Sequence, residues 1–554
     1  MRLSELGRFW RTVRHLRPIQ MVGRAHFLWH RPQLDLSAAP PRRPACGHWV
    51  YPAARAPSQT GSLRLRFLSV ERALDDCGWD RPEVDRLWRY NLHYFDDLNA
   101  EAAAHRRDWQ RDLMARWLAG NPPAQGTGWE PYPISLRVVN WIKWFLAGQP
   151  TEAAWLHSLA VQVRWLRGRL ERHLLGNHLF ANAKALVFAG LFFDGDEARG
   201  WLDTGVAILA RELPEQILTD GGHFERSTMY HALALEDLLD LINILRAHAH
   251  ESAPASQLLP ALTRHASAML NWLRCMSHPD GGIALFNDAA LGIAPDNAEL
   301  ESYAQRLGIQ AAQPPAEGLT DLMPSGYVRA ARGPAVALLD AAPIGPDYLM
   351  GHAHADTLAF ELSLQGRRVI VNGGTSCYGL GAQRLRERGT AWHSTVQVGN
   401  ADSSEVWSGF RVGRRARVTF RRLQGWEVMA SHDGWRFLPG APVHRRSWSL
   451  SGDGLVVDDS LSPGSPTRQP AVARFHLAPG LRLLPAGATC FAVTDGKREL
   501  AQVDIEAGSA SVTTSQHAPR FGQLEATQTL AVTLHNGHAR THWRWSPDAH
   551  PVSD

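Results

Sequence analysis

Apolar residues recur at helical spacing through the first half of the chain, from about residue 85 to residue 320. Short stretches of Gly, Pro and Asp separate the segments in which this pattern is clearest, which are 134–148, 151–175, 196–218, 227–249 and 260–281. Helices joined by short connections pack as antiparallel pairs, which either close into a toroid or extend as a solenoid. No fixed sequence period recurs, which favours a closed toroid.

Near residue 325 the pattern changes to short runs of alternating apolar and polar residues. In 357–375 two such runs flank Gln365 and Gly366, which predicts a β-hairpin. Many short strands with frequent turns are typical of an antiparallel sandwich. We therefore predict an α+β multidomain chain, with an (α/α) toroid before an antiparallel β-sandwich-like domain and a linker in 317–326. The predicted domains are an N-terminal extension packing on the toroid (1–84), the toroid (85–322) and the sandwich (323–554).

Composition and charge narrow the class of protein. Hydrophobic residues make up 44% of the 554 residues and the net charge is +4, which is globular composition and argues against nucleic-acid binding. The five cysteines are scattered, which argues against a disulfide framework. No apolar run reaches the ~18 residues of a membrane span. The N-terminus lacks the apolar core of a signal peptide, so we expect a cytoplasmic protein by default.

The N-terminal 32 residues also mix aromatic and basic side chains. Such a segment either lies on a membrane surface or packs on the next domain, and packing is the favoured interpretation. The pattern does not indicate an oligomeric state.

The stretch "GHAHAD" (351–356) places two imidazoles and a carboxylate on alternate positions. If it is extended, His352, His354 and Asp356 share one face, and the following hairpin brings Asn372 close to them. His393 lies in a later alternating run. Histidines from two strands can meet at a metal ion, and hydrogen-bonded histidines within a sheet are the alternative.

Three further clusters carry polar or aromatic residues at helix starts. "GNHLFANAK" contains Asn177 and His178, and "GGHFERSTMYH" contains Glu225 and Tyr230; capping and core packing are the simpler explanations. Aromatic rings at the start of a helix can stack on sugar rings, and an arginine there can pair with a sugar carboxylate. Packing between helices is the alternative explanation for the same residues. The residues concerned in "GWEPYPISLR" are Trp129, Glu130, Tyr132 and Arg137. The 21 tryptophans also favour a carbohydrate ligand.

Six motifs between about residues 88 and 415 occur in one order: "NLHYFDDL", "GNHLFAN", "GGHFERSTMYH", "GHAHADTLAFEL", "VNGGT" and "RGTAWHSTVQV". Together they resemble the heparinase II/III-like polysaccharide lyases. The resemblance implies a toroid followed by a β-sandwich-like domain, with β-elimination on a uronic-acid polysaccharide in the cleft between them. The implied partner is an acidic polysaccharide or oligosaccharide, and heparan, alginate, hyaluronan-like and bacterial capsular or secreted polymers all remain open. Because family members are often exported, a periplasmic location also remains open.

Elimination explains the residue types that the resemblance assigns. The site must neutralise the uronate carboxylate, remove the C5 proton and protonate the C4 oxygen. By resemblance, Asn177 and His178 neutralise the carboxylate together with His352. Tyr230 matches the catalytic tyrosine, and either His352 or Tyr378 is its partner, with base and acid not distinguished. The expected substrate-binding residues are Trp129, Glu130, Tyr132, Arg137, Glu225 and Arg388.

The resemblance also implies a structural zinc ion, with His354 and His393 as ligands, and no organic cofactor. Where the family has an aspartate as the third ligand, this chain has Asn372 in "VNGGT". A neutral amide is a much weaker zinc ligand than a carboxylate. The metal is therefore lost, bound more weakly, or completed by Asp356.

Two other functions compete with the lyase. A glycoside hydrolase on the same toroid needs two opposed carboxylates, for which Glu130, Asp220 and Glu225 are candidates. A non-catalytic exopolysaccharide binding or assembly protein would keep the cleft without needing Tyr230 or Asn177. The lyase is preferred because the chain has the whole set of Asn177, His178, Tyr230 and His352.

Overall fold

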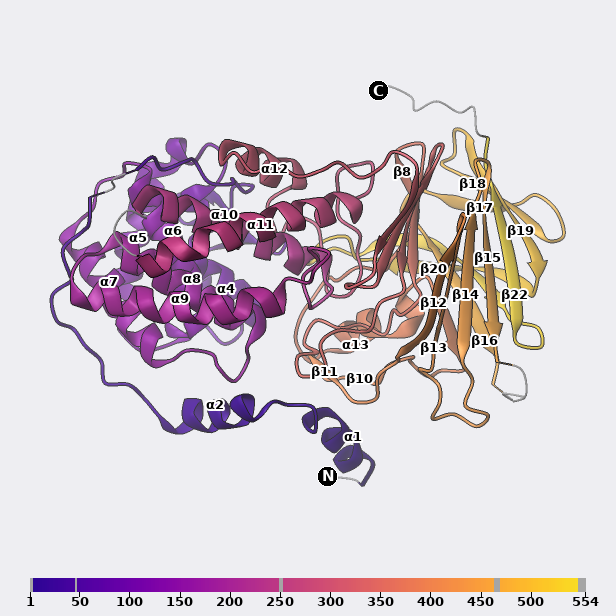
Figure 1. The fold of residues 1–554 in the computed structure, drawn as a ribbon, viewed down its shortest axis with the longest axis horizontal. Helices are drawn as coiled ribbons and strands as arrows, with labels where there is room; N and C mark the ends of the chain where they lie inside the picture. The colour runs from indigo at the N-terminus through magenta and orange to yellow at the C-terminus, as the bar shows by residue number, and fades with distance from the viewer. Residues whose placement is uncertain (1–2, 45–46, 249–252, 463–468, 547–554) are drawn as a thin grey trace.

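The computed structural model describes residues 3–44, 47–248, 253–462 and 469–546, and it divides into a helical half and a strand-rich half (Figure 1). The α-helices are α1 (Leu3–Val13), α2 (Pro18–Trp29), α3 (Leu74–Cys77), α4 (Arg86–Tyr94), α5 (Arg107–Gly120), α6 (Pro131–Leu146), α7 (Ala153–Gly168), α8 (Gly176–Phe192), α9 (Asp196–Gln216), α10 (Thr228–His248), α11 (Ala253–Cys275), α12 (Asn297–Arg306) and α13 (Ala382–Arg388).

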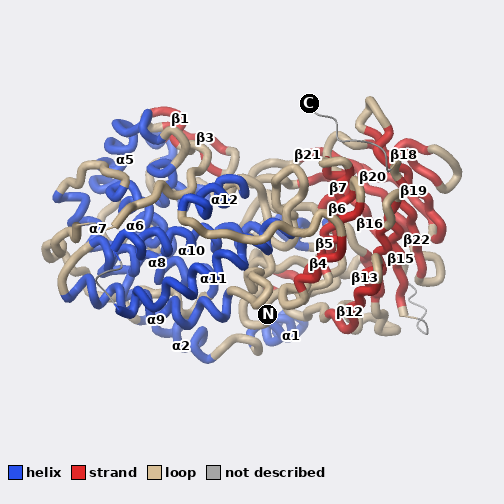
Figure 2. The backbone as a smooth tube through the Cα atoms, turned by 45° about the horizontal axis from the view of Figure 1, so that its top comes forward, coloured by secondary structure: helices blue, strands red, loops and turns tan. Residues whose placement is uncertain are grey.

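The helical half is an (α/α) toroid, as predicted (Figure 2). Its core centres on α8, where every residue from Leu179 to Phe192 is buried. A helix that is apolar on all sides is stable only when neighbours surround it, and α8 packs against α6, α9 and α10. The toroid therefore encloses its most apolar helix and leaves the start of α8 facing the second half.

The strand-rich half is an antiparallel sandwich of two sheets, also as predicted. One sheet has the order β12-β13-β14-β15-β22-β19-β18-β17 and the other β20-β21-β16-β8-β7-β6-β5-β4, with β9 paired to β16. Side chains such as Phe360, Trp448, Phe475 and Trp543 fill the core between them. The predicted hairpin is confirmed as β7 and β8, because Gln365 (φ 52°) and Gly366 (φ 83°) form its turn.

The strands of the larger sheet are β4 (Gly318–Leu322), β5 (Tyr327–Arg332), β6 (Ala335–Asp340), β7 (Phe360–Leu364), β8 (Arg367–Val371), β9 (Val396–Val398), β16 (Ala471–Leu477), β20 (Ser509–His517) and β21 (Glu525–Thr533). Those of the facing sheet are β12 (Val418–Gln424), β13 (Glu427–His432), β14 (His444–Leu450), β15 (Gly454–Leu461), β17 (Arg482–Pro485), β18 (Cys490–Thr494), β19 (Glu499–Ala507) and β22 (His538–Arg544). The remaining strands are β1 (Gln59–Gly61), β2 (Arg64–Phe67), β3 (Val70–Ala73), β10 (Val406–Trp407) and β11 (Arg411–Val412).

An apolar cluster joins the two halves. Trp272 from α11 and Met276 just after it pack with Phe286 and with Tyr327 and Leu338 from β5 and β6. A large apolar contact of this kind holds two domains in a fixed orientation, so loops from both halves can build one site.

Two local predictions are wrong, and a third describes only part of the contacts. The predicted linker contains β4, because Gly318–Leu322 pairs with β5 through backbone hydrogen bonds that its composition does not reveal. Residues 351–356 form turns and not a strand, which begins only at Phe360. The N-terminal extension contacts the sandwich half as well as the toroid, since Arg11 of α1 forms an ion pair with Glu405 at 2.8 Å.

Candidate active site

Residues from both halves meet at the first turn of α10. The Tyr230 ring stacks on the His352 imidazole, with ring centroids 3.7 Å apart. The Tyr230 and Tyr378 hydroxyls are hydrogen-bonded at 3.1 Å. Burial raises the pKa of both phenols well above the usual value, so each carries its proton at neutral pH.

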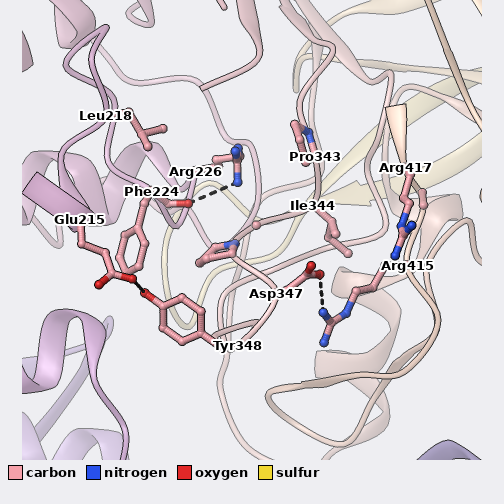
Figure 3. Close-up of a pocket in the computed structure, with 13 residues that line it drawn as sticks. Glu215, Leu218, Phe224, Arg226, Pro343, Ile344, Asp347, Tyr348, Arg415 and Arg417 are labelled. Atoms are coloured by element: carbon pink, nitrogen blue, oxygen red, sulfur yellow. Dashed lines mark hydrogen bonds and ion pairs between the residues drawn. The ribbon is translucent and has the colours of Figure 1, made fainter. Parts of the chain in front are cut away.

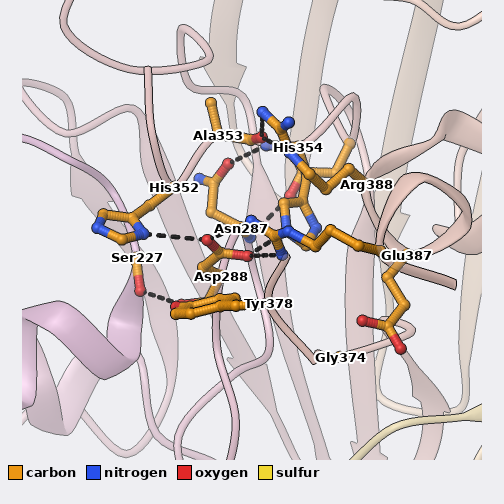
Figure 4. Close-up of polar contacts among 12 residues, drawn as sticks. Ser227, Asn287, Asp288, His352, Ala353, His354, Gly374, Tyr378, Glu387 and Arg388 are labelled. Atoms are coloured by element: carbon orange, nitrogen blue, oxygen red, sulfur yellow. Dashed lines mark hydrogen bonds and ion pairs between the residues drawn. The ribbon is translucent and has the colours of Figure 1, made fainter. Parts of the chain in front are cut away.

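Asp288 holds two imidazoles and an arginine in place (Figure 4). His352 Nδ1 lies 3.0 Å from Oδ2, and His354 Nε2 lies 2.7 Å from Oδ1. The Arg384 guanidinium donates to both carboxylate oxygens. Burial alone would raise the pKa of Asp288, but Arg384 and the imidazoles lower it well below its usual range.

The ionised Asp288 fixes the tautomer of His352. A carboxylate only accepts hydrogen bonds, so we assign the ring proton of His352 to Nδ1. The lone pair of His352 is then on Nε2, at the opposite corner of the ring.

Glu225 connects His352 with the start of α8. Its Oε2 lies 3.5 Å from His352 Nε2, which is longer than a hydrogen bond. Burial raises the pKa of Glu225, against the lowering influence of His352, the Asn177 backbone amide and His178. These three groups therefore surround one buried carboxyl group.

The start of α8 depends on an unusual backbone conformation. Leu175 (φ 63°) and Gly176 (φ 52°) precede Asn177 and His178. A Cβ at Gly176 would lie 2.4 Å from Leu349 Cδ2 and 3.0 Å from Glu225 Oε1, so a larger residue would have to displace these side chains in addition to adopting the positive φ. Strained backbone of this kind is commonly retained where it positions functional groups.

His178 is held by a buried carboxylate. Its Nδ1 lies 3.0 Å from Glu171 Oε1, while the Asn182 amide donates to Glu171 Oε2 at 3.0 Å. Burial alone would lower the pKa of His178, but the Glu171 carboxylate overcomes this effect and raises it. The Tyr132 ring lies next to it, with centroids 4.6 Å apart.

A cavity of about 440 Å³ lies beside the loop that carries Glu225, and its lining includes neither Tyr230 nor His352 (Figure 3). Phe224 and Arg226, the sequence neighbours of Glu225, form part of its wall. Arg415 and Arg417 contribute cationic groups from the sandwich half, although Arg415 is paired with Asp347. Its lining carries both signs of charge, because Glu215 and Asp347 also belong to it.

Three predicted substrate-binding residues are structural instead. The Trp129 ring is buried and stacks on Trp117, with centroids 6.0 Å apart. Arg137 is fully buried and donates to the His93 and Gly128 carbonyls, and Arg388 is fully buried and donates to the Ala353 carbonyl. None of them is accessible to a sugar, because each satisfies core carbonyls or fills the core.

The other predicted residues lie closer to the cluster. Tyr132 contacts His178, and Glu225 is buried beside His352. Glu130 is partly exposed and forms an ion pair with Arg86 at 2.7 Å.

The predicted metal ligands lie close together, but they do not form a three-ligand set. The His354 and His393 rings lie 5.3 Å apart, and both His354 Nδ1 and His393 Nε2 are buried without a hydrogen-bond partner among the described residues. Asn372, the predicted third ligand, already makes hydrogen bonds with both ends of its side-chain amide. Its Oδ1 lies 2.9 Å from His393 Nδ1, and its Nδ2 donates to the Leu285 carbonyl.

Asp356 does not complete the set. It accepts from the Asn287 backbone amide at 2.9 Å, and no group of three His, Cys, Asp or Glu side chains suited to a metal occurs within the described ranges. The described residues thus offer two unpartnered imidazole nitrogens but no carboxylate or thiolate as a third ligand, and we derive no catalytic step through a metal.

This difference predicts the effect of restoring a carboxylate. Asn372→Asp is expected to tighten zinc binding by about 10- to 100-fold, because a carboxylate either ligates zinc or makes His393 more basic. Zinc per chain, measured by mass spectrometry after dialysis against graded zinc buffers, tests this. His393→Ala in the same background should remove the gain, and equal zinc uptake by Asn372→Asp and the parent chain would contradict the argument.

Sequence reasoning missed three residues that position the histidines: Asp288, Glu171 and Arg384. Asp288 orients His352, Glu171 orients His178, and Arg384 pairs with Asp288. Asp288 follows Asn287 at the end of the apolar stretch "IALF", and this placement of polar residues is the only signal for it. Arg384 lies in the basic run before Gly389, which looks like a solvated surface. Glu171 ends an ordinary amphipathic pattern and carries no signal of its own.

Two family models match most of the chain. The heparinase II/III N-terminus matches residues 75–307, and the heparinase II/III-like C-terminal model matches residues 314–546. The solved structure of heparinase III has a TM-score of 0.64 and 16% identity, and the comparison covers 96% of this chain and 86% of that one. This last likeness concerns the fold alone.

Curated relatives include proteins of two kinds. FtsZ-localized protein C of Caulobacter vibrioides is 27% identical over 467 residues, which cover 78% of this chain and 77% of that protein. A heparin-sulfate lyase of Bacteroides stercoris is 26% identical over 252 residues, which cover 42% of this chain. The chain spans only 37% to 54% of the lengths of the three heparin-sulfate lyases that it matches.

Proposed function

The chain belongs to the heparinase II/III-like family, and we propose that it is a polysaccharide lyase that cleaves a uronic-acid-containing polysaccharide by β-elimination between the toroid and the sandwich. The observation that carries the proposal is the direct contact of Tyr230 with His352 and Tyr378 across the two halves. A phenol and an imidazole in contact supply the proton donor and the proton acceptor that elimination needs.

In the proposed mechanism, His178 and Asn177 neutralise the uronate carboxylate. The pKa of His178 is raised by Glu171, which favours the imidazolium at neutral pH. A cation beside the carboxylate makes the C5 proton more acidic and stabilises the negative charge that develops as this proton leaves.

The proton transfers follow from the protonation states. His352 Nε2 has the free lone pair and takes the C5 proton. The electron pair of the C5–H bond forms the C4–C5 double bond, and the bond from C4 to its leaving oxygen breaks. Tyr230, which keeps its proton because its pKa is raised, donates that proton to the leaving oxygen, and Tyr378 positions it.

The hydrolase alternative finds less support. Asp220 accepts from the backbone amide and hydroxyl of Ser325, with the hydroxyl at 2.7 Å. Glu130 is paired with Arg86, and Glu225 is buried with a raised pKa. These three carboxyls lack the free pair, flanking one open space, that inverting or retaining hydrolysis needs.

A panel of uronic-acid polymers tests the reaction directly. We expect one polymer to yield products that absorb in the ultraviolet, because elimination leaves a double bond conjugated to the carboxylate. New reducing ends without this absorbance would indicate a hydrolase. Binding without cleavage would favour the non-catalytic function.

The pH profile tests the role assigned to His178. Its raised pKa keeps the imidazolium present at neutral pH, so kcat/KM should fall as the pH rises through this pKa. Glu171→Gln removes the group that raises the pKa, and burial then lowers it. We expect the alkaline limb to move to lower pH.

The matched control is Glu301→Gln, which removes a carboxylate that pairs with Arg274 at 2.9 Å away from the cluster. Its pH profile should equal that of the parent chain. If the limb stays in place in Glu171→Gln, another group controls it and the role given to His178 is wrong.

A further inference from the structure

Helix α1 contacts the rest of the molecule through its polar side, whereas the inner side of α2 also carries Phe27, whose ring packs on His173. In α1, Arg11 donates twice to Glu405, at 2.8 and 2.9 Å, and Thr12 accepts from the Trp407 indole at 3.0 Å. In α2, Gln20 donates to the Tyr348 carbonyl at 3.2 Å. An ordinary surface helix packs its apolar side inward, so the orientation of α1 is reversed, and α2 packs only part of its apolar side chains inward.

The apolar sides of both helices face away from the molecule. On α1 the exposed side carries Leu6, Phe9 and Trp10, and the Trp10 side chain is 65% exposed. On α2 the residues opposite Gln20 and Phe27 at 100° per residue are Met21, Val22, Ala25, Leu28 and Trp29. Val22 is 68% exposed and Trp29 is 86% exposed.

Exposed apolar side chains are concentrated in this segment of the chain. Of the 22 large apolar side chains that are exposed in the described part of the chain, 11 lie between Leu6 and Leu36. Both helices run along one edge of the molecule, beneath the toroid and the junction with the sandwich in Figure 1. Single exposed apolar residues scattered over a protein surface are normal, whereas a group of them in one region usually marks a binding site.

The charge of the same segment is strongly positive. Residues 1–31 contain seven arginines and one glutamate, a net charge of +6, whereas the whole chain carries +4 and the remainder therefore −2. Arg14, Arg24 and Arg31 are exposed beside the apolar side chains. Tryptophan and leucine on one side with arginine at the flanks is the pattern of a helix lying in the interface of an anionic lipid bilayer.

We propose that α1 and α2 form a membrane-surface site that binds anionic lipid, with their apolar sides in the headgroup region and the arginines on lipid phosphates. Within the described ranges no helix has the length and apolar character needed to cross a bilayer, so the attachment would be peripheral. The proposal does not depend on the lyase function, because none of these residues belongs to the cluster around Tyr230.

Vesicle flotation of the full chain tests the proposal, with phosphatidylcholine alone or mixed with phosphatidylglycerol. We expect binding to the mixed vesicles, weakened by salt because part of the attraction is electrostatic. Val22→Glu and Trp29→Glu should each lower the binding constant by about tenfold or more, and Arg24→Ala by about fivefold. The thermal midpoint should not change, because these side chains are exposed.

The control is Met323→Glu, at an apolar side chain that is 65% exposed on the β4–β5 turn, which should bind like the parent chain. Absence of flotation with the mixed vesicles would overturn the proposal. So would equal flotation of Trp29→Glu and the parent chain. A dimer of the parent chain that dissociates in Trp29→Glu, without vesicle binding, would show that a second copy covers this surface instead.

Discussion

Tyr230→Phe is expected to lower kcat by about 10²- to 10⁴-fold, because it removes the proposed proton donor and leaves the aromatic ring in place. The ring should still stack on His352, so substrate binding and KM should change little. The lost hydrogen bond to Tyr378 should cost about 1 kcal/mol of unfolding free energy. Steady-state kinetics and thermal unfolding on the same preparation measure both effects.

Tyr303→Phe is the matched control for this variant. Tyr303 is also a buried toroid phenol, and its hydroxyl lies 2.9 Å from the Asn243 amide and 3.2 Å from Asp240. This variant should lose comparable stability and keep kcat. Unchanged turnover in Tyr230→Phe would contradict the proposed mechanism. If neither the parent chain nor the variant cleaves any polymer, the non-catalytic function would replace the lyase as the proposal.

The parts of the fold that were predictable have local causes. Helical periodicity identified α6, α7, α9, α10 and α11, since each buries an apolar side against its neighbours, whereas α8 is buried on all sides and lacks such a pattern. Gln365 and Gly366 identified the β7–β8 hairpin, because the turn needs residues that tolerate positive φ. Strand β4 was missed, because only its partner β5 distinguishes it from a linker.

The candidate site was predictable only in part, because its geometry depends on distant partners. The motifs pointed to Tyr230 and His352, but the alternation argument wrongly treated 351–356 as extended. Trp129 and Arg137 looked like sugar-binding groups at a helix start, yet the neighbouring helices cover both. Asp288 and Arg384 are 96 residues apart in the chain, and only the packed structure brings them together.

Asp288→Asn is expected to remove both stability and activity. Arg384 is fully buried and would lose its counter-charge, which typically costs about 3–5 kcal/mol. The new amide can donate a hydrogen bond to His352 Nδ1, which would move the ring proton to Nε2 and remove the lone pair needed by the proposed base. We expect kcat to fall by about 10³-fold or more at temperatures where the variant is folded.

A second substitution separates the two effects. In Asp288→Asn combined with Arg384→Met no buried charge is left unpaired, so much of the lost unfolding free energy should return. Turnover should stay low, because nothing in the double variant restores the carboxylate that fixes the His352 tautomer. If turnover recovers together with stability, Asp288 is only a structural partner of Arg384, and His352 takes up its proton without the help assigned to that carboxylate.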